Sequence, residues 1–349
     1  MVEPKISIIV PAYNEEKFLE QAFNSIYNQT FPFEEIELIL IDHGSTDETK
    51  KIIQNYAEKY ENISPIYLTE NTGSPSYPRN IGAKHAKADY LMYLDTDDNY
   101  CENMCEVMYK NAIKYDADIV SCRNYDIIDD TGKKTIFHSI LDKKEPIVKL
   151  ETIDDDPQFL TSTAMLIWNK IYRKSLILNN NIEFPTGNLY EDNLFNIQAY
   201  IKANGIVFLN DFFGYNYQIR VSGEEKSISQ DFKKENLLKF KGGLIKVFNV
   251  LIKENRSYPS FEAELLGGFM KWIFFTDADV EFKINVYNEV KEFYDRYSIF
   301  SRITFKPIIF NIIINITISI IKKSTICFKL MLKSYKIIAK LIYFKRGIK

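Results

Sequence analysis

A chain of 349 residues with 46% hydrophobic composition can bury a large core and is long enough for two domains. Its net charge of −3 conceals an asymmetry. Residues 301–349 contain eleven Lys or Arg and no acidic side chain, whereas residues 1–300 carry 33 basic and 47 acidic side chains. The acidic body argues against a nucleic acid as partner, and the basic end favours an anionic surface.

The first 120 residues alternate short apolar runs with amphipathic stretches. Strands are predicted at 5–10, 36–41, 63–68, 90–94 and 118–122, and helices at 16–29, 47–60, 78–87 and 100–114. This alternation predicts the α/β class, with a Rossmann-like, mostly parallel sheet covered by helices on both faces. Ligands of such sheets bind beyond the carboxyl ends of the strands, so the polar residues that follow each strand are the candidate site.

Two of these strand ends have the residues expected of a nucleotide pocket. Pro11–Asn14 follows the first strand and Asp42–Ser45 follows the second. Tyr13 offers an aromatic face for a base, and Asp42 can accept hydrogen bonds from a base or a ribose hydroxyl. Simple packing of Tyr13 and capping of the next helix by Thr46 or Asp47 are the alternatives, and capping is compatible with the pocket.

A third strand end contains three carboxylates, Asp95, Asp97 and Asp98, directly after the apolar run of Leu91–Leu94. Carboxylates crowded at the end of a buried strand repel one another unless a cation or a proton lies among them. Mg²⁺ and Mn²⁺ prefer oxygen ligands and commonly share a site with substrate phosphates. The cluster therefore indicates a divalent metal that binds a diphosphate, with a solvated turn as the alternative.

Several segments of the first hundred residues carry one recognisable set of motifs: Ile6–Glu15, Ser25–Phe31, Asp42–Asp47, Asn71–Gly82 and Leu94–Asp98. Together they resemble the nucleotide-sugar-binding half of family 2 inverting glycosyltransferases, which have the GT-A nucleotide-diphospho-sugar transferase fold. The resemblance implies a Mn²⁺ or Mg²⁺ ion held mainly by Asp97, with Asp95 and Asp98 beside it. It also implies donor contacts from Pro11, Tyr13, Asp42, His43, Asn71, Arg79, Asp95 and Thr96.

Arg79 and His43 are two of these expected donor contacts. Pro78 at the first helical position, with Arg79 behind it, would direct a cation and free N–H groups toward phosphate oxygens; a surface ion pair is the alternative for Arg79. His43 replaces the second aspartate of the family's usual Asp-Asp-Gly-Ser, the residue that reads the uracil edge. A neutral imidazole can still accept a hydrogen bond from a ring N–H, so a uridine carrier remains compatible with His43.

The second half of the signature is Leu189–Phe195, which opens an amphipathic helix. It resembles the Glu-Asp motif of the family, whose aspartate acts as general base on the acceptor hydroxyl. An inverting transferase needs one carboxylate facing the acceptor and a Lewis acid on the leaving diphosphate. The resemblance implies Asp192 as the base and Glu191 as an acceptor contact. Stabilisation of a helix N-terminus by two acidic residues is the alternative.

Residues 160–187 resemble the segment that lines the acceptor cleft in this family. Trp168 could stack on a sugar there, with a core position as the alternative. Farther along, Arg220 and Lys226 are the candidates to close over the diphosphate, and Gly223 would let their loop move.

The last third of the chain is expected to be helical. Helices are predicted at 232–256 and 260–297, with close packing at Gly267–Gly268, and a basic amphipathic helix at about 307–345. That last helix has a narrow polar stripe rich in lysine, which favours an anionic membrane surface, with packing on protein as the alternative. The expected domains are a catalytic domain at 1–230, divided into 1–99 and 100–230, and a helical region at 231–349.

The four cysteines show neither metal-site spacing nor a disulfide pattern, and the N-terminus has no signal-peptide pattern. These features predict a cytoplasmic protein, peripheral at the inner face of the cell membrane. Homo-oligomerisation stays open, and nucleic acid is not expected as a partner.

We therefore expect a metal-dependent inverting glycosyltransferase that moves a hexose or N-acetylhexosamine from a nucleotide sugar, with UDP as the expected carrier. Its acceptor would be a cell-envelope glycan, a teichoic-acid-like polymer or a lipid-linked glycan, in polysaccharide biosynthesis. Within the family the motifs look most like wall teichoic acid N-acetylglucosaminyltransferases. The alternatives are a nucleotidyltransferase, although residues 11–16 lack the Gly-rich loop usual in that class, and a non-catalytic glycan-binding protein.

Overall fold

The computed structural model describes residues 2–128, 132–136, 145–163, 165–219 and 232–297. The chain forms two compact units, Met1–Ile228 and Ser229–Lys349. The described part of the first unit is built on one ten-stranded sheet. The described part of the second unit consists of helices.

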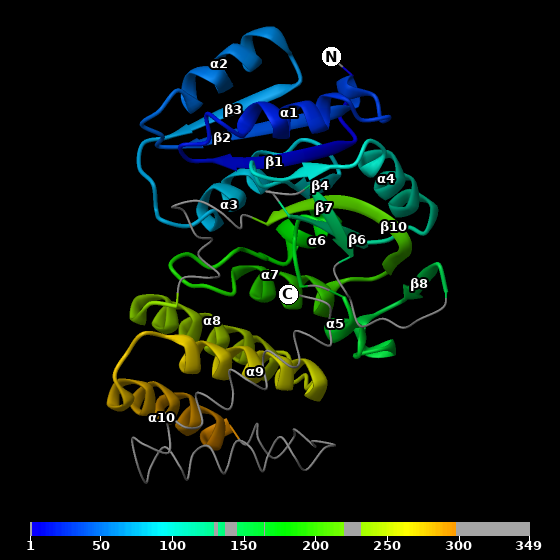
Figure 1. The fold of residues 1–349 in the computed structure, drawn as a ribbon. Coiled ribbons are helices and arrows are strands. Elements are labelled where there is room, and N and C mark those ends of the chain that lie inside the picture. The colour runs from blue at the N-terminus through cyan, green and yellow to red at the C-terminus, as the bar shows by residue number, and fades with distance from the viewer. Residues whose placement is uncertain (1, 129–131, 137–144, 164, 220–231, 298–349) are drawn as a thin grey trace. The chain divides into compact units, whose positions relative to one another are not determined.

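Parallel strands form the N-terminal half of the sheet, in the order β3-β2-β1-β4 (Figure 1). The strands are β1 (Ile6–Ala12), β2 (Ile36–His43), β3 (Ile63–Leu68) and β4 (Tyr90–Tyr93). The helices that connect them are α1 (Leu19–Tyr27), α2 (Thr49–Lys59) and α3 (Ser76–His85), with a 3₁₀ turn at Phe33–Glu35. β1 and β2 are buried along almost their whole length and mostly apolar, as expected for strands covered on both faces, and the predicted α/β class is confirmed.

The second half continues the sheet in the order β4-β9-β6-β10-β5, with β7 on β6 and β8 on β10. Its strands are β5 (Asn99–Tyr100), β6 (Ile119–Ile128), β7 (Lys133–Ile136), β8 (Ile147–Leu150), β9 (Lys170–Arg173) and β10 (Ile206–Ile219). Its helices are α4 (Met104–Lys114), α5 (Phe159–Ser162), α6 (Lys174–Asn179) and α7 (Glu191–Lys202), with a 3₁₀ turn at Ile153–Asp155. β9 runs antiparallel to both β4 and β6, so it joins the two halves.

β10 contains an irregularity that changes its neighbours. Its first part, Ile206–Leu209, lies between β6 and β8, and its second part, from Phe213 onward, pairs with β6 and β5. The register shifts fall between Leu209 and Tyr215, where Asn210, Asp211 and Gly214 interrupt the apolar pattern. Such a bulge bends a strand and increases its twist, and here it carries the residues after Gly214 to the carboxyl end of β4.

The second unit contains α8 (Lys234–Lys253), α9 (Pro259–Phe275) and α10 (Val280–Tyr297), with α8 contacting both others (Figure 1). The prediction of one helix at 260–297 is wrong, because Thr276 ends α9 with its hydroxyl on the Trp272 carbonyl (2.7 Å). Asp279 then accepts the Phe282 N–H (2.8 Å) and starts α10.

Gly267 is not a close packing point, since a Cβ there would meet no described atom within 4 Å. None of the described helices is long and apolar enough to cross a membrane. The predicted basic helix at 307–345 lies outside the described residues.

α3 packs closely on the sheet at Gly82. A Cβ at this position would lie 2.5 Å from a methyl carbon of Ile9 and 3.0 Å from the Cδ1 of Ile41. Only glycine lets the helix that carries Arg79 approach β1 and β2 this closely.

We predict that Gly82→Ala destabilises the first unit by about 1–3 kcal/mol, because overpacking outweighs the better helix propensity of alanine. The matched change Gly267→Ala should instead stabilise α9 by up to about 1 kcal/mol. Urea unfolding followed by tryptophan fluorescence separates the two effects, since Trp168 lies in the first unit and Trp272 in the second. Unchanged first-unit stability in Gly82→Ala would contradict the packing.

Candidate active site

The loops that follow β1 and β2 are hydrogen-bonded to each other. Asn14 has a left-handed backbone (φ 55°), and its side-chain oxygen accepts the Thr46 N–H at 2.9 Å. Its own N–H donates to the Ser45 hydroxyl at 3.0 Å. The first two polar strand ends therefore form one continuous surface.

The nucleotide residues predicted on this surface have different exposures. Tyr13 is 42% exposed, so its ring is accessible, whereas Asp42 is buried and accepts the Ser45 N–H at 3.1 Å. Gly44 has φ +76°, and a Cβ there would lie 3.2 Å from the Glu70 backbone. This glycine lets the loop after β2 approach the segment after β3, which carries Asn71.

His43 is buried and binds the loop after β3. Its Nε2 lies 3.1 Å from the Thr72 backbone N and 3.2 Å from the Thr72 hydroxyl. A backbone amide can only donate, so Nε2 accepts and the neutral ring carries its proton on Nδ1. Burial lowers the pKa of His43, and the nearby Asp42 acts in the opposite direction. In the described structure the accepting nitrogen of His43 is thus bonded to Thr72.

Asp98 joins the acidic cluster to β10. It is 1% exposed, and its two oxygens accept from the Tyr215 hydroxyl and the Gln218 N–H, both at 2.7 Å. Burial, followed by the charges of Asp97 and Asp95, raises the pKa of Asp98 to about 8. The bulge in β10 thereby fixes one carboxylate of the cluster.

The carboxylate oxygens of the acidic cluster are the kind of ligand that a hard divalent cation prefers. Asp95 and Asp97 are partly exposed, and Thr96 between them is buried. Burial is the main cause of the raised pKa of Asp98, and the charges of Asp97 and Asp95 add to it, a repulsion that a cation would offset. Among the described residues, no group of three His, Cys, Asp or Glu side chains is placed to hold a metal alone. A metal here would need further oxygen ligands, such as phosphate.

Arg79 connects the acidic cluster to the candidate base. It is 4% exposed, and its Nη2 lies 2.6 Å from an oxygen of Asp95. Its Nη1 lies 3.6 Å from the Oδ1 of Asp192, and its guanidinium lies over the ring of Phe184 at 5.5 Å. The alternative of a surface ion pair is therefore wrong. The Nε of Arg79 and the Oδ1 of Asp192 are buried without a hydrogen-bond partner in the described structure.

Asp192 stands in the first turn of α7, after Tyr190, whose backbone is left-handed (φ 72°). Burial raises the pKa of Asp192 to about 7, while Arg79 lowers it and Glu191 raises it. Burial also raises the pKa of Glu191. A carboxylate that titrates near neutral pH is suited to take up and release a proton.

Asn80 is a positioning residue that sequence reasoning missed. Its side-chain amide donates to the Phe184 carbonyl (2.9 Å) and accepts the Phe184 N–H (2.8 Å). Phe184 stacks on Phe195 of α7 with ring centroids 4.0 Å apart. Asn80 thus ties the helix of Arg79 to the segment that leads to the base, and its position directly after Arg79 was the available signal.

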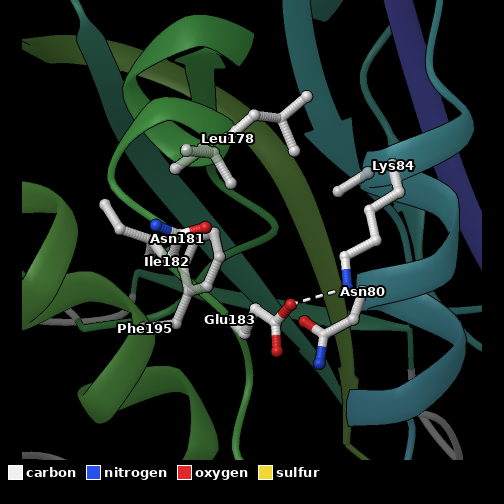
Figure 2. Close-up of a pocket in the computed structure, with 9 residues that line it drawn as sticks. Asn80, Lys84, Leu178, Asn181, Ile182, Glu183 and Phe195 are labelled. Carbon is white, nitrogen blue, oxygen red and sulfur yellow. Dashed lines mark ion pairs between the residues drawn. The ribbon is translucent and has the colours of Figure 1, made fainter.

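The same region contains a small pocket between α3, α6 and α7 (Figure 2). Lys84 of α3 and Glu183 form an ion pair at 2.7 Å beside it. Asn80 and Phe195 line the same pocket. The ion pair adds a second connection between α3 and the segment before the base.

Trp168 is 4% exposed and stacks on Tyr215 at 4.0 Å between ring centroids, with Tyr217 parallel at 5.7 Å. This burial fits the core alternative rather than stacking on a sugar. Trp168 supports the same part of β10 that binds Asp98. Arg220 and Lys226 lie outside the described residues.

Comparisons of the sequence identify related proteins. The model of the family described as "Glycosyl transferase family 2" matches residues 7–190. The chain is 33% identical over 227 residues to a poly(ribitol-phosphate) beta-glucosyltransferase of Bacillus spizizenii, covering 64% of this chain and 34% of that protein. It is 32% identical over 230 residues to the poly(ribitol-phosphate) beta-N-acetylglucosaminyltransferase TarS of Staphylococcus aureus, covering 64% and 37%. The match spans about a third of the length of these relatives.

Solved structures agree with these relationships. Residues 1–349 of S. aureus TarS, in complex with UDP-GlcNAc, superpose with a TM-score of 0.62 at 25% identity, covering 81% of this chain and 79% of that chain. A mannosyltransferase of Pyrobaculum calidifontis, with GDP-Man and Mn²⁺, superposes with a TM-score of 0.51 at 14% identity, covering 86% and 84%. The predicted GT-A fold is confirmed.

We predict that Asn80→Ala lowers the free energy of unfolding by about 1–3 kcal/mol, because both Phe184 backbone groups lose their partner. Asn111→Ala is the matched control, since the Asn111 side chain donates to the Val107 carbonyl of its own helix. Urea titration measures both variants. Equal losses in the two would contradict the connection between α3 and the Phe184 segment.

Proposed function

Since the chain belongs to glycosyl transferase family 2, we propose that it transfers a sugar from a nucleoside-diphosphate sugar to an acceptor hydroxyl with inversion. The observation that carries the proposal is the buried Arg79, which contacts both Asp95 at the acidic cluster and Asp192 on α7. A donor held at the first carboxylate would lie beside the second, as a single displacement requires.

The donor would bind along the carboxyl ends of β1, β2 and β4. Tyr13 has an accessible ring for a base, and Asp42 lies at the same strand ends. The binding of UDP and of UDP-GlcNAc by TarS supports UDP as the carrier. The remaining proposed donor residues are Pro11, His43, Asn71, Arg79, Asp95, Thr96, Arg220 and Lys226.

Asp192 would act as the general base. Its carboxylate takes the proton of the acceptor hydroxyl as that oxygen forms a bond to the anomeric carbon, and the bond from this carbon to the diphosphate oxygen breaks. The positive charge of Arg79 favours the ionised form of Asp192, which is the form that accepts a proton. Glu191, beside the base, would contact the acceptor.

A divalent metal, Mn²⁺ or Mg²⁺, would be held by Asp97 together with Asp95. When bound, such an ion supplies Lewis-acid stabilisation of the negative charge on the leaving diphosphate. Asp98 is the least suited of the three predicted ligands, because both its oxygens already accept hydrogen bonds from β10.

The acceptor would be a teichoic-acid-type polyol-phosphate polymer, and the sugar a hexose or N-acetylhexosamine. Both named relatives act on poly(ribitol phosphate), one as a glucosyltransferase and one as an N-acetylglucosaminyltransferase. A location at the inner membrane surface remains a proposal from the sequence of residues 307–345 alone.

We predict that Asp192→Asn lowers kcat by about 10²–10⁴-fold, the usual contribution of a general base, with little change in donor affinity. In the unchanged protein, kcat/KM should fall as the pH drops below about 7, because protonation removes the accepting form of Asp192. Transfer assays across pH and calorimetric titration of UDP with Mn²⁺ provide the measurements. Lost donor affinity in Asp192→Asn would argue against the base role.

We also predict that Asp97→Ala abolishes the stimulation of nucleotide binding by Mn²⁺, because its carboxylate is the main proposed ligand. Asp211→Ala is the matched control, an exposed carboxylate in the bulge of β10. Thermal shift with UDP, GDP and CDP, each with and without Mn²⁺, measures the effect and compares the carriers. Stimulation that persists in Asp97→Ala would contradict the assignment of Asp97 as the main metal ligand.

A further inference from the structure

A lysine is completely buried inside the first unit. Lys170 opens β9, and its Nζ donates to the Leu166 carbonyl and, at 2.9 Å, to the side-chain oxygen of Asn169. A buried ammonium is costly unless hydrogen bonds and negative charge compensate it. Lys170 therefore fixes the turn before β9 and also places a positive charge in the interior.

The same face of β9 packs on the helix of the candidate base. Tyr172 is two residues from Lys170, so both side chains project to one side of the strand. The Tyr172 hydroxyl donates to Asn196 at 2.7 Å, and the Asn196 amide donates to the backbone carbonyl of Asp192 at 2.9 Å. The face that carries Lys170 therefore lies against the first turns of α7.

The charges around Asp192 come from several elements. Arg79 of α3 and Lys170 of β9 lower its pKa, whereas Glu191 of α7 and Asp95 after β4 raise it. Arg79 lies 3.6 Å from one carboxylate oxygen, and Lys170 lies on the face of β9 that packs on α7. Two buried cations on different elements therefore act on this carboxylate.

The influence of the two groups is mutual. Burial lowers the pKa of Lys170 to about 7, and the charge of Asp192 is the largest effect in the opposite direction, followed by that of Cys122. Ionisation of either group therefore favours ionisation of the other.

We propose that Lys170 is a positioning residue for the reaction, whose buried ammonium stabilises the ionised carboxylate of Asp192 from the face of β9 that packs on α7. The role of Lys170 in the reaction rests on the proposed function, whereas its charge coupling to Asp192 does not. Lys170 itself touches no reacting atom. It acts by keeping Asp192 in the form that accepts a proton, and by fixing the turn that carries Trp168.

The test is Lys170→Met, which keeps an unbranched side chain and removes the charge. The titration midpoint of Asp192, followed by ¹³C NMR of the aspartate carboxyl carbons and assigned with Asp192→Asn, should rise by about half a pH unit or more. The acid limb of kcat/KM should move upward by the same amount, so activity falls near pH 7 and recovers at alkaline pH. Donor affinity should stay unchanged.

Lys174→Met is the matched control. The Lys174 ammonium also donates to backbone carbonyls, those of Ala86 and Lys87, but it is not among the main groups that shift the pKa of Asp192. It should leave both the midpoint and the acid limb in place. Loss of activity by one constant factor at every pH in Lys170→Met, with an unmoved Asp192 midpoint, would overturn the proposal in favour of packing alone.

A reciprocal measurement covers the case in which Lys170→Met does not fold. The titration of the Lys170 amine, followed by ¹⁵N NMR, should move to lower pH in Asp192→Asn, because the stabilising negative charge is gone. An unmoved amine would overturn the proposal. If the unchanged protein transfers no sugar while both titrations shift, the proposed function fails and the coupling of Lys170 to Asp192 stands.

Discussion

The arrangement of the candidate site in the first unit depends on one buried guanidinium. Arg79 is removed from water, so its charge must be met by carboxylates, and those available are Asp95 on one side and Asp192 on the other. These carboxylates belong to different halves of the sequence. Gly82 sets the depth of α3 in the sheet, and Asn80 fixes the Phe184 segment. Gly82 and Asn80 together hold Asp95 and Asp192 against the two terminal nitrogens of the same guanidinium.

A second constraint orients the acidic cluster. The bulge in β10 redirects the strand so that Tyr215 and Gln218 occupy both oxygens of Asp98. With that carboxylate fixed and buried, the neighbouring Asp95 and Asp97 remain partly exposed at the strand end. The cluster thus divides into one buried member bonded to β10 and two partly exposed members, a division set by pairing between distant strands.

The sequence predicted the parallel strands and most strand-end residues, because continuous apolar runs followed by polar turns are local signals. β9 and β10 have no such pattern: a fully buried lysine, Lys170, opens one strand and Gly214 interrupts the other, so long-range pairing decides them. The same limit applies to side chains. Folding alone brings together the segments that decide three of these side chains. They are His43, whose accepting nitrogen bonds to the Thr72 backbone amide, Trp168, which is buried, and Arg79, which pairs with two carboxylates.

The left-handed backbone of Tyr190 has a consequence for how the protein could diversify. Such a conformation costs a bulky residue about 1–2 kcal/mol, and the folded chain bears this cost whether or not a ligand is present. The direction of Glu191 and Asp192 is therefore set by the main chain. Side chains around them can change over evolutionary time, while these two carboxylates keep their direction.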